Sequence, residues 1–305
     1  MFLRQLSYLV ALDLHRHFSR AAAHCGVSQP ALSAGIRQLE SELGIAIIQR
    51  NHRFIGFTDD GLRALAWARQ TLAALDGLRQ DAAFAQTVTG GSLAIGVIPS
   101  ALLTVPLLLE SFRSAIPGLH QEILTLSATE MQTALLERRV QLGVTYLDQI
   151  ESDSQFEVLP LYTEQYVLAA HGSAVLPPGD HCNWREAAQY PLCLFTSSFR
   201  CRQFVDDAFK REGVMPTIVM ETDSLAVLHA ELRGGRVCSI LPSAALPHDV
   251  GPSGLTTRTL CSPGAAQVGV ARLRLPMQSA LMELVWGHAR RLGEHDVLQL
   301  GLASE

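Results

Sequence analysis

The chain has 305 residues, of which 48% are hydrophobic and 17% charged, a composition typical of a soluble protein with two or three globular domains. No apolar run approaches the ~20 residues that a membrane-spanning helix requires, and the N-terminus shows no clear signal-peptide cleavage site, so we expect a cytoplasmic protein. The formal net charge of −5 is unevenly distributed: residues 1–58 carry six Arg against three acidic residues, whereas the remainder carries 18 basic and 26 acidic residues.

The basic N-terminal stretch predicts three short helices and a β-hairpin. Residues 2–14 have apolar side chains at helical spacing and form the first helix. A second helix covers about 20–24, with Ser19 as its N-cap. A tight turn at 25–27 separates it from a third helix. A basic module on an acidic body favours contact with phosphate groups.

The third helix carries the most informative pattern in the chain. Ser28 is a favourable N-cap, and Pro30 lies in the first turn, where its missing N–H is harmless. Apolar side chains recur at helical spacing and predict a buried face made of Leu32, Ile36, Leu39 and Leu43. The opposite face presents Gln29, Ser33 and Arg37. Such a face reads bases and phosphates from the major groove of DNA, so the pattern indicates a helix-turn-helix. The alternative is a helical hairpin whose polar face meets water.

Residues 45–58 predict a two-stranded wing with a polar tip at 50–53. Arg50 and Arg53 in this tip are candidates for contact with the phosphate backbone or the minor groove. We therefore expect residues 1–58 to form a winged helix-turn-helix domain.

A long helix is predicted to start at Thr58 or Asp59 and to reach about Gln86. Its Ala-rich apolar seam has heptad-like spacing, and the small N-terminal domain cannot cover one whole side of so long a helix. We expect the seam to pack against a second copy of the chain, the alternative being a helix buried within one domain. Residues 59–90 would then hold a dimerisation helix and a hinge.

Residues 91–305 predict two lobes in which strands alternate with helices. The first lobe, about 91–162 and 267–305, has expected strands at 92–98, 119–126, 142–146 and 267–273, and expected helices at 100–114, 127–139 and 277–291. The second lobe, about 163–266, has expected strands at 192–195, 218–221 and 237–241, and expected helices at 199–212 and 224–233. Two crossings between the lobes, the first at about 157–170, indicate a hinged pocket. The fold class is therefore mixed α+β and α/β.

The sequence AAAHCGVSQPALSAGIRQLESELGIAIIQR, followed by Arg53 and by TDDG at 58–61, resembles the N-terminal module of LysR-type transcriptional regulators. Gly96, Pro117, Gly235 and the Leu241-Pro242 pair occur in the order found in the effector domain of that family, itself similar to periplasmic binding proteins. The resemblance implies a winged helix-turn-helix that binds double-stranded DNA, a dimer through the linker helix and usually a tetramer. It also implies a small-molecule effector between the lobes, and RNA polymerase is a candidate partner.

The expected DNA contacts come from the third helix and the wing: Ser28, Gln29, Pro30, Ser33, Arg37, Arg50 and Arg53. Gln29 suits bidentate pairing with adenine. Two positions depart from the family pattern. Ala34-Gly35 replaces a longer polar or basic pair, and Gly35 weakens the helix by up to ~1 kcal/mol relative to Ala. Gln141 stands where the family often has Asp before a strand.

The effector pocket is expected where strands lead into helices, at the carboxyl ends of a parallel sheet. Hydroxyl-bearing residues at four such junctions bring helix N-termini toward one cleft, which favours an anion such as a small carboxylate. The expected effector-binding residues are Pro99, Ser100, Thr129, Tyr146, Thr196, Ser197, Arg200 and Ser224. The alternative for each hydroxyl is simple helix capping.

Two cysteines raise a second functional hypothesis. The peroxide-sensing branch of the resembled family uses a disulfide switch, and Cys193 and Cys201 lie eight residues apart in the second lobe. Cys201 lies near a predicted helix N-terminus, which would lower the pKa of its thiol. The alternative is a pair of packed thiols. A redox sensor that uses Cys201 is therefore the alternative to a regulator that binds an anionic effector.

Enzymatic function finds no support in the sequence. The chain contains no HExxH, G-x-S-x-G, Walker or GxGxxG motif. The six cysteines show no zinc spacing, so we expect no metal site and no cofactor. A solute-binding protein without DNA function is the distant alternative, and it would leave the basic N-terminal module unexplained.

Overall fold

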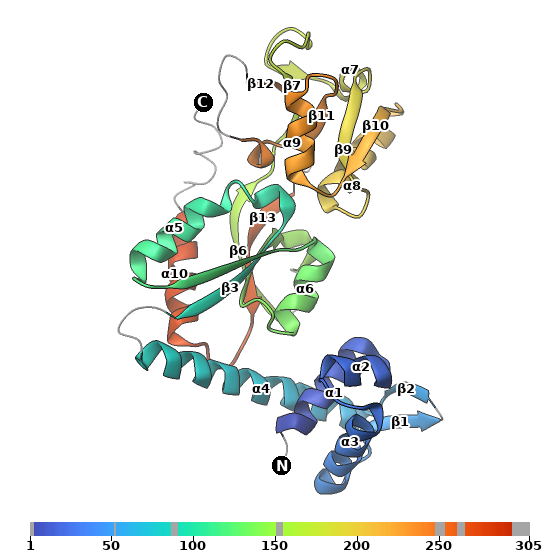
Figure 1. Cartoon of the computed structure of the whole chain (residues 1–305), viewed down its shortest axis with the longest axis vertical. Coiled ribbons are helices and arrows are strands. Elements are labelled where there is room, and N and C mark those ends of the chain that lie inside the picture. The colour runs from blue at the N-terminus through green and yellow to red at the C-terminus, as the bar shows by residue number, and fades with distance from the viewer. Residues whose placement is uncertain are drawn as a thin grey trace. The chain divides into compact units, whose positions relative to one another are not determined.

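The computed structural model describes residues 3–51, 53–86, 91–150, 155–247, 254–260 and 266–294. The chain divides into two compact units, one of Met1–Gln86 with Leu275–Ser279, the other of Thr87–Arg274 with Ala280–Glu305. Figure 1 shows the elements of both units. Among the described residues, no helix is both long and apolar enough to cross a membrane.

The N-terminal unit is a winged helix-turn-helix followed by one long helix, as the sequence predicts. Its elements are α1 (Leu3–His15), α2 (Phe18–His24), α3 (Gln29–Leu43), β1 (Ile48–Asn51), β2 (Arg53–Phe57) and α4 (Asp59–Gln86). Strands β1 and β2 pair antiparallel and form the wing. The core is built from apolar side chains of α1, α2, α3, the wing and the start of α4, including Leu9, Leu12, Leu32, Ile36, Ile47 and Leu65.

Two local predictions in this unit are wrong. Helix α2 begins at Phe18 rather than Arg20, and its N-cap is His17, whose Nδ1 accepts the N–H of Ser19 at 3.2 Å. An imidazole nitrogen satisfies the free N–H as a serine hydroxyl would. Leu43 is 50% exposed and does not belong to the buried face of α3, because it lies in the last turn, just before Gly44 ends the helix in a left-handed conformation.

A polar junction fixes α3, the wing and α4 together. Glu40 Oε1 of α3 accepts the N–H groups of Ile47 and Ile48 at 2.9 and 3.1 Å. Thr58 donates its N–H to the Ile47 carbonyl at 3.0 Å and accepts the N–H of Gly61 on its Oγ1 at 2.9 Å. Thr58 thereby caps α4 while it binds the chain segment that precedes the wing.

The first lobe of the second unit is a five-stranded sheet in the order β4-β3-β5-β13-β6. Strands β3, β4 and β5 are parallel, and β13 pairs antiparallel with both β5 and β6. Helices α5 and α10 lie on one side of the sheet and α6 on the other (Figure 1). The bounds are β3 (Ser92–Val97), α5 (Val105–Ala115), β4 (His120–Thr125), α6 (Ala128–Leu136), β5 (Leu142–Tyr146), β6 (Phe156–Thr163), β13 (Gln267–Leu273) and α10 (Ala280–Glu294).

Three sequence expectations for this lobe have clear outcomes. Ser127 caps α6 in a capping box with Glu130, which is the helix-capping alternative given above for the hydroxyls at these junctions. The helix expected from Ser100 begins only at Val105, because Pro99–Ala101 forms a separate 3₁₀ turn, η1. Gln141 takes on the anchoring of β5: its Oε1 accepts the N–H of Ala94 at 2.7 Å, and its own N–H donates to the Ala94 carbonyl at 2.9 Å.

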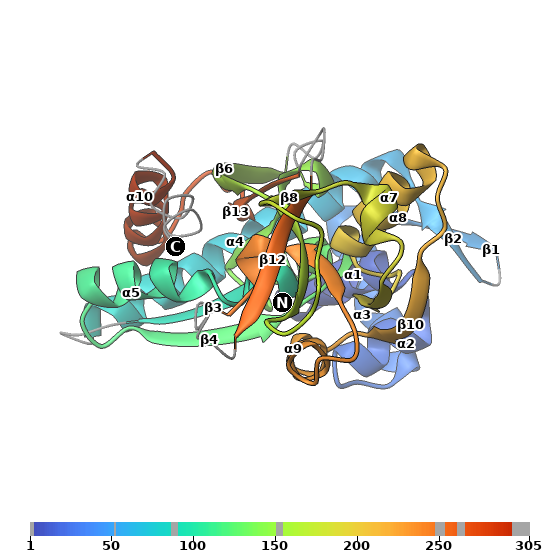
Figure 2. The same ribbon diagram turned by 90° about the horizontal axis from the view of Figure 1, so that it is seen from above.

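The second lobe contains two sheets. Strands β9 and β10 pair in parallel, and a second sheet has the order β11-β7-β12-β8, in which β7 is antiparallel to its two neighbours. Strands β8 and β12 lie next to each other in Figure 2. The sequence predicts only a crossing at 157–170, where the structure has the strands β6 and β7, and it does not predict β8, β12 or the short helix α7. The bounds are β7 (Tyr166–His171), β8 (His181–Cys182), α7 (Trp184–Ala187), β9 (Pro191–Phe195), α8 (Arg200–Glu212), β10 (Thr217–Thr222), α9 (Leu225–Arg233), β11 (Ser239–Pro242), the 3₁₀ turn η3 (Ser243–Ala245) and β12 (Leu255–Leu260). Another 3₁₀ turn, η2 (Leu147–Gln149), follows β5 in the first lobe.

The junction between α4 and the wing predicts the effect of one substitution. A Cβ added at Gly61 would lie 2.1 Å from the carbonyl oxygen of Ile47, so Gly61→Ala forces the backbones apart. We expect a loss of about 1–3 kcal/mol in the free energy of unfolding of the N-terminal unit, measured by urea denaturation.

Gly77→Ala in the same helix is the matched control, because a Cβ there meets no atom within 4 Å. It should stabilise the unit by up to ~1 kcal/mol through helix propensity. Equal effects of the two substitutions would contradict the role given to the Ile47 contact.

Candidate functional site

The exposed face of α3 is the candidate DNA-reading surface. Ser28 caps the helix by accepting the N–H of Ala31 at 3.4 Å, and Gln29 and Pro30 beside it are exposed. One turn further on, the guanidinium of Arg37 donates to Ser33 Oγ at 3.2 Å. The predicted polar residues therefore lie along one side of α3, next to the face of its buried residues Leu32, Ile36 and Leu39, with Gln29 and Arg37 exposed.

Gly35 has a packing role that the sequence reading did not foresee. A Cβ at this position would approach the ring of Tyr8 on α1 to 2.8 Å. The missing side chain thus lets α1 lie close against α3, which compensates for the weaker helix propensity of glycine. The departure from the family pattern reflects the contact between these two helices.

Arg50 lies in β1 and Arg53 in β2, but the side chains of both, and all of His52, lie outside the described residues. Their contact with DNA stays a prediction.

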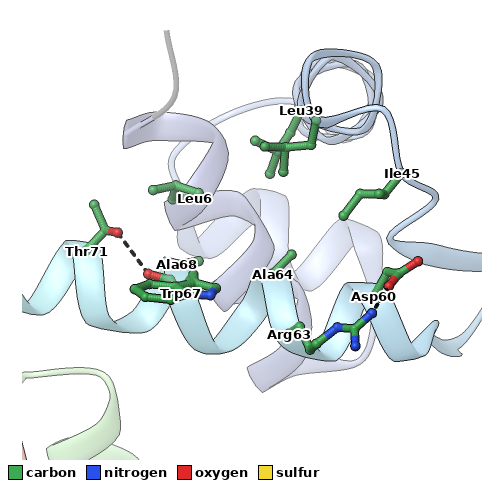
Figure 3. Close-up of a pocket in the computed structure, with 10 residues that line it drawn as sticks. Leu6, Leu39, Ile45, Asp60, Arg63, Ala64, Trp67, Ala68 and Thr71 are labelled. Carbon is green, nitrogen blue, oxygen red and sulfur yellow. Dashed lines mark hydrogen bonds and ion pairs between the residues drawn. The ribbon is translucent and has the colours of Figure 1, made fainter.

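An apolar groove runs along the first turns of α4 (Figure 3). It measures about 390 Å³ and is lined by Leu6, Leu39, Leu43, Ile45, Asp60, Arg63, Ala64, Trp67, Ala68 and Thr71. The indole of Trp67 forms one wall and is 70% exposed, and Leu62 and Leu78 of the same helix are 52% and 65% exposed. Large apolar side chains with this exposure mark an interaction surface.

A buried hydrogen-bonded cluster joins the two lobes. Tyr146, at the end of β5, donates its hydroxyl to both carboxylate oxygens of Glu164, at 3.0 and 3.1 Å. Tyr166, at the start of β7 in the second lobe, donates to the same carboxylate at 3.1 Å. Ser100 Oγ of η1 lies 2.9 Å from the Tyr146 hydroxyl. All four residues are at most 2% exposed, so one carboxyl gathers hydroxyls from both lobes.

The environment of Glu164 changes its acidity. Burial raises the pKa of this carboxyl from 4.5 to about 7, against the opposing effects of the Tyr146, Ser100 and Tyr166 hydroxyls and of the Arg200 charge. A buried carboxyl with a pKa near neutrality is typical of functional sites. Burial also raises the pKa of Tyr146 and Tyr166 well above their usual range, so both hydroxyls stay protonated.

Cys201 also belongs to this cluster. Its thiol is buried in the first turn of α8, close enough to Tyr146 for that hydroxyl to lower the pKa of the thiol. The expectation of a lowered pKa is wrong: burial and, next, the charge of Glu164 raise the pKa of Cys201 to about 12. The N–H groups of Cys201 and Arg202 at the helix N-terminus act in the opposite direction but are weaker.

The remaining predicted effector residues have varied surroundings. Pro99 is buried in η1. Arg200, expected to bind the effector, is 25% exposed and already pairs with Asp148 at 3.0 Å, so it does not offer a free positive charge to an anion. Three of the other four hydroxyls make local bonds, Thr129 with Ser127, Thr196 with Ser198, and Ser224 as the N-cap of α9, and Ser197 is exposed.

Sequence reasoning found Ser100 and Tyr146 but missed Glu164 and Tyr166. The available signal was a single acidic residue at the crossing between two apolar strands, a position where a carboxyl becomes buried when the lobes close on it. The cysteine pair also differs from the expectation. Cys193 is buried in β9, where its N–H donates to the Cys238 carbonyl, and both Cys193 and Cys201 are free thiols.

Comparison with known proteins agrees with the fold. A family model described as "LysR substrate binding domain" matches residues 86–293, and one described as "Bacterial regulatory helix-turn-helix protein, lysR family" matches residues 3–62. The two units thus define a DNA-binding transcription regulator with an effector domain, not an enzyme. The chain belongs to the LysR-type transcriptional regulator family.

Individual relatives add detail. The hydrogen peroxide-inducible genes activator of Dickeya chrysanthemi is 31% identical over 254 residues, which cover 82% of this chain and 81% of that protein. A full-length OxyR from Pseudomonas aeruginosa has a similar fold, with a TM-score of 0.64, 23% identity and coverage of 96% and 99%. Full-length CbnR in complex with its target DNA has a TM-score of 0.58, 22% identity and coverage of 96% and 100%.

The surface of α3 predicts the effect of truncating Gln29. With an operator identified by selection from genomic DNA, Gln29→Ala should weaken specific binding by about 1–3 kcal/mol and leave nonspecific binding unchanged. Fluorescence anisotropy of labelled duplexes measures both. Gln38→Ala is the matched control, because Gln38 is exposed on the other side of α3 and bonds Glu42. If Gln29→Ala retains full operator affinity, Gln29 is not a base-reading residue.

Proposed function

We propose that this LysR-type regulator senses a small oxidant of the hydrogen peroxide class through Cys201 and that oxidation alters its binding to double-stranded DNA. The observation that carries the proposal is the position of Cys201 in the cluster that joins the two lobes. The similarity to a hydrogen peroxide-inducible genes activator supports it. An anionic effector is less well supported, because the buried Glu164 lies in the middle of the cluster and Arg200 is already paired with Asp148.

The proposed reaction is a simple thiol oxidation. The sulfur of Cys201, as thiolate, attacks one oxygen of the peroxide, so that an S–O bond forms and the O–O bond breaks. The second oxygen takes up a proton and leaves as water. Sulfur is oxidised to sulfenic acid and peroxide is reduced. The chemistry ends there in this proposal, since Cys193 is packed inside β9.

An oxygen atom added to the sulfur of Cys201 would change the packing between the two lobes. Cys201 lies in the second lobe and contacts Tyr146 of the first. A well-packed interior does not accept an extra atom without movement of its neighbours. The sulfenic oxygen would therefore displace Tyr146 and Glu164 and change the relative position of the lobes.

We further propose that the regulator acts in the cytoplasm as a dimer joined through α4, and that dimers pair into tetramers and contact RNA polymerase. Helix α4 is 28 residues long, about 42 Å, and the exposed Leu78, three turns beyond Trp67 on the same face, continues the apolar groove as an exposed apolar line. A second α4 is the occupant that matches both the groove and this exposed apolar line, because a two-fold interface uses the same surface of each copy.

Replacing Cys201 tests the sensor. Peroxide should add one oxygen to Cys201 of the wild-type protein, detected by mass spectrometry, and should change its footprint on operator DNA. Cys201→Ser should bind the operator and lose the response to peroxide. Cys25→Ser is the control, because Cys25 lies in the N-terminal unit, and it should respond like the wild type. A full response from Cys201→Ser would refute the proposal.

Replacing Trp67 tests the dimer. Trp67→Glu places a charge in the apolar groove and should shift the protein toward monomer in sedimentation velocity, with weaker binding to two-half-site DNA. Gln70→Glu adds the same charge to the same helix at an exposed position outside the groove lining and should leave the dimer intact. A dimer of unchanged stability with Glu at position 67 would place the interface elsewhere.

A further inference from the structure

The hydroxyl of Tyr146 lies between a carboxyl and a thiol. It donates to Glu164 at 3.0 Å and is close enough to the thiol of Cys201 to lower the pKa of that thiol. A phenol has a single proton to donate. It can therefore stabilise a negative charge on Glu164 or on Cys201, but not on both at once.

The groups around Glu164 also restrict the cluster to one negative charge. The carboxyl of Glu164 faces Tyr146 from β5, Tyr162 from β6 and Tyr166 from β7, and Ser100 from η1. From α8 it faces the thiol of Cys201 and the guanidinium of Arg200, whose charge is balanced by Asp148. The cluster thus contains no unbalanced cation among the described residues. Two negative charges in such a buried site are strongly disfavoured.

We propose that Cys201 and Glu164 share one negative charge through the hydroxyl of Tyr146, so that Glu164 takes up the proton that Cys201 loses on becoming reactive. In the resting form the thiol donates to the Tyr146 oxygen and Tyr146 donates to the carboxylate. In the reactive form Tyr146 donates to the thiolate and the protonated carboxyl donates to Tyr146. One proton moves along each hydrogen bond, and the charge of the cluster is unchanged. Glu164 acts on the thiol through Tyr146 and is a positioning residue.

This arrangement has a specific pH signature. Below the pKa of Glu164, about 7, the reactive form requires loss of a proton to solvent, so its population rises about tenfold per pH unit. Above that pKa the pair has already lost one proton, and moving the other proton between the two groups does not depend on pH. The reactivity of Cys201 in the wild-type protein should therefore level off above about pH 7.

The variant Glu164→Gln distinguishes a negative charge shared with Cys201 from other influences on the reactivity of that thiol. Glu164→Gln keeps an oxygen that accepts from Tyr146 and Tyr166 but holds no charge and takes up no proton. The thiol of this variant titrates alone, so its reactivity continues to rise about tenfold per pH unit beyond neutrality. We expect equal rates near pH 7 and rates about 10-fold and about 100-fold above the wild type one and two pH units higher.

The experiment is the pH profile of alkylation of Cys201 by iodoacetamide in the full-length protein. The peptide that contains Cys201 is followed by mass spectrometry after digestion with chymotrypsin, because Arg200 and Arg202 flank the cysteine and trypsin would cut on both sides. Glu122→Gln is the control, since Glu122 is exposed on β4 and should give the wild-type profile. Circular dichroism checks the fold of each variant.

Two results would overturn the proposal. One is a wild-type profile that rises steadily through neutrality with a single midpoint near the thiol's own high pKa, which needs no variant to be observed. The other is a folded Glu164→Gln variant whose profile levels off like that of the wild type. The inference rests on Cys201 as the sensing thiol, but the alkylation profile uses neither peroxide nor DNA. If Cys201→Ser keeps its peroxide response, the proposed function fails while the profile still reports the shared charge.

Discussion

The burial of one carboxyl, that of Glu164, constrains the effector domain more than any other feature. A carboxyl removed from water needs hydrogen-bond partners, and here they come from β5 and η1 in the first lobe and from β7 in the second. The lobes therefore cannot separate without exposing the carboxyl or leaving it unpaired. In the proposed sensor, a chemical change at the sulfur of Cys201, which lies beside the same tyrosine, would therefore be coupled to a change in lobe position.

The N-terminal unit depends on a different kind of constraint, the close approach of backbone segments. Gly61 lies against the carbonyl of Ile47, and Thr58 bonds the same carbonyl. The orientation of α3 relative to the start of α4 is thereby fixed through Glu40 and the wing. A regulator that dimerises through α4 would carry its two reading helices at a defined spacing, which is what recognition of two half-sites requires.

The junction of α3, the wing and α4 and the buried cluster between the lobes differ in their chemistry. The junction in the N-terminal unit is held by the close approach of Gly61 to Ile47 and by the hydrogen bonds of Glu40 and Thr58. The interlobe cluster is buried but ionisable, and the pKa of Glu164 lies near neutrality. In the proposed sensor, the reactive thiol would lie in the effector domain and the reading helix in the N-terminal unit, so that sensing and DNA recognition are separate.

The sequence by itself determined the elements whose signals are local. The Ser28 cap, the Ser127–Glu130 capping box and the apolar periods of α3 and α4 depend on residues within a few positions of each other, and they define the family and the DNA-reading helix. Tertiary structure alone decided the remainder. Residues far apart in sequence set the packing of Gly35 on Tyr8, the addition of β12 beside β7, and the raised pKa of Cys201. A helix N-terminus lowers a thiol pKa locally, but burial beside Glu164, a residue 37 positions earlier in the chain, outweighs it, because desolvation and charge act through space rather than along the sequence.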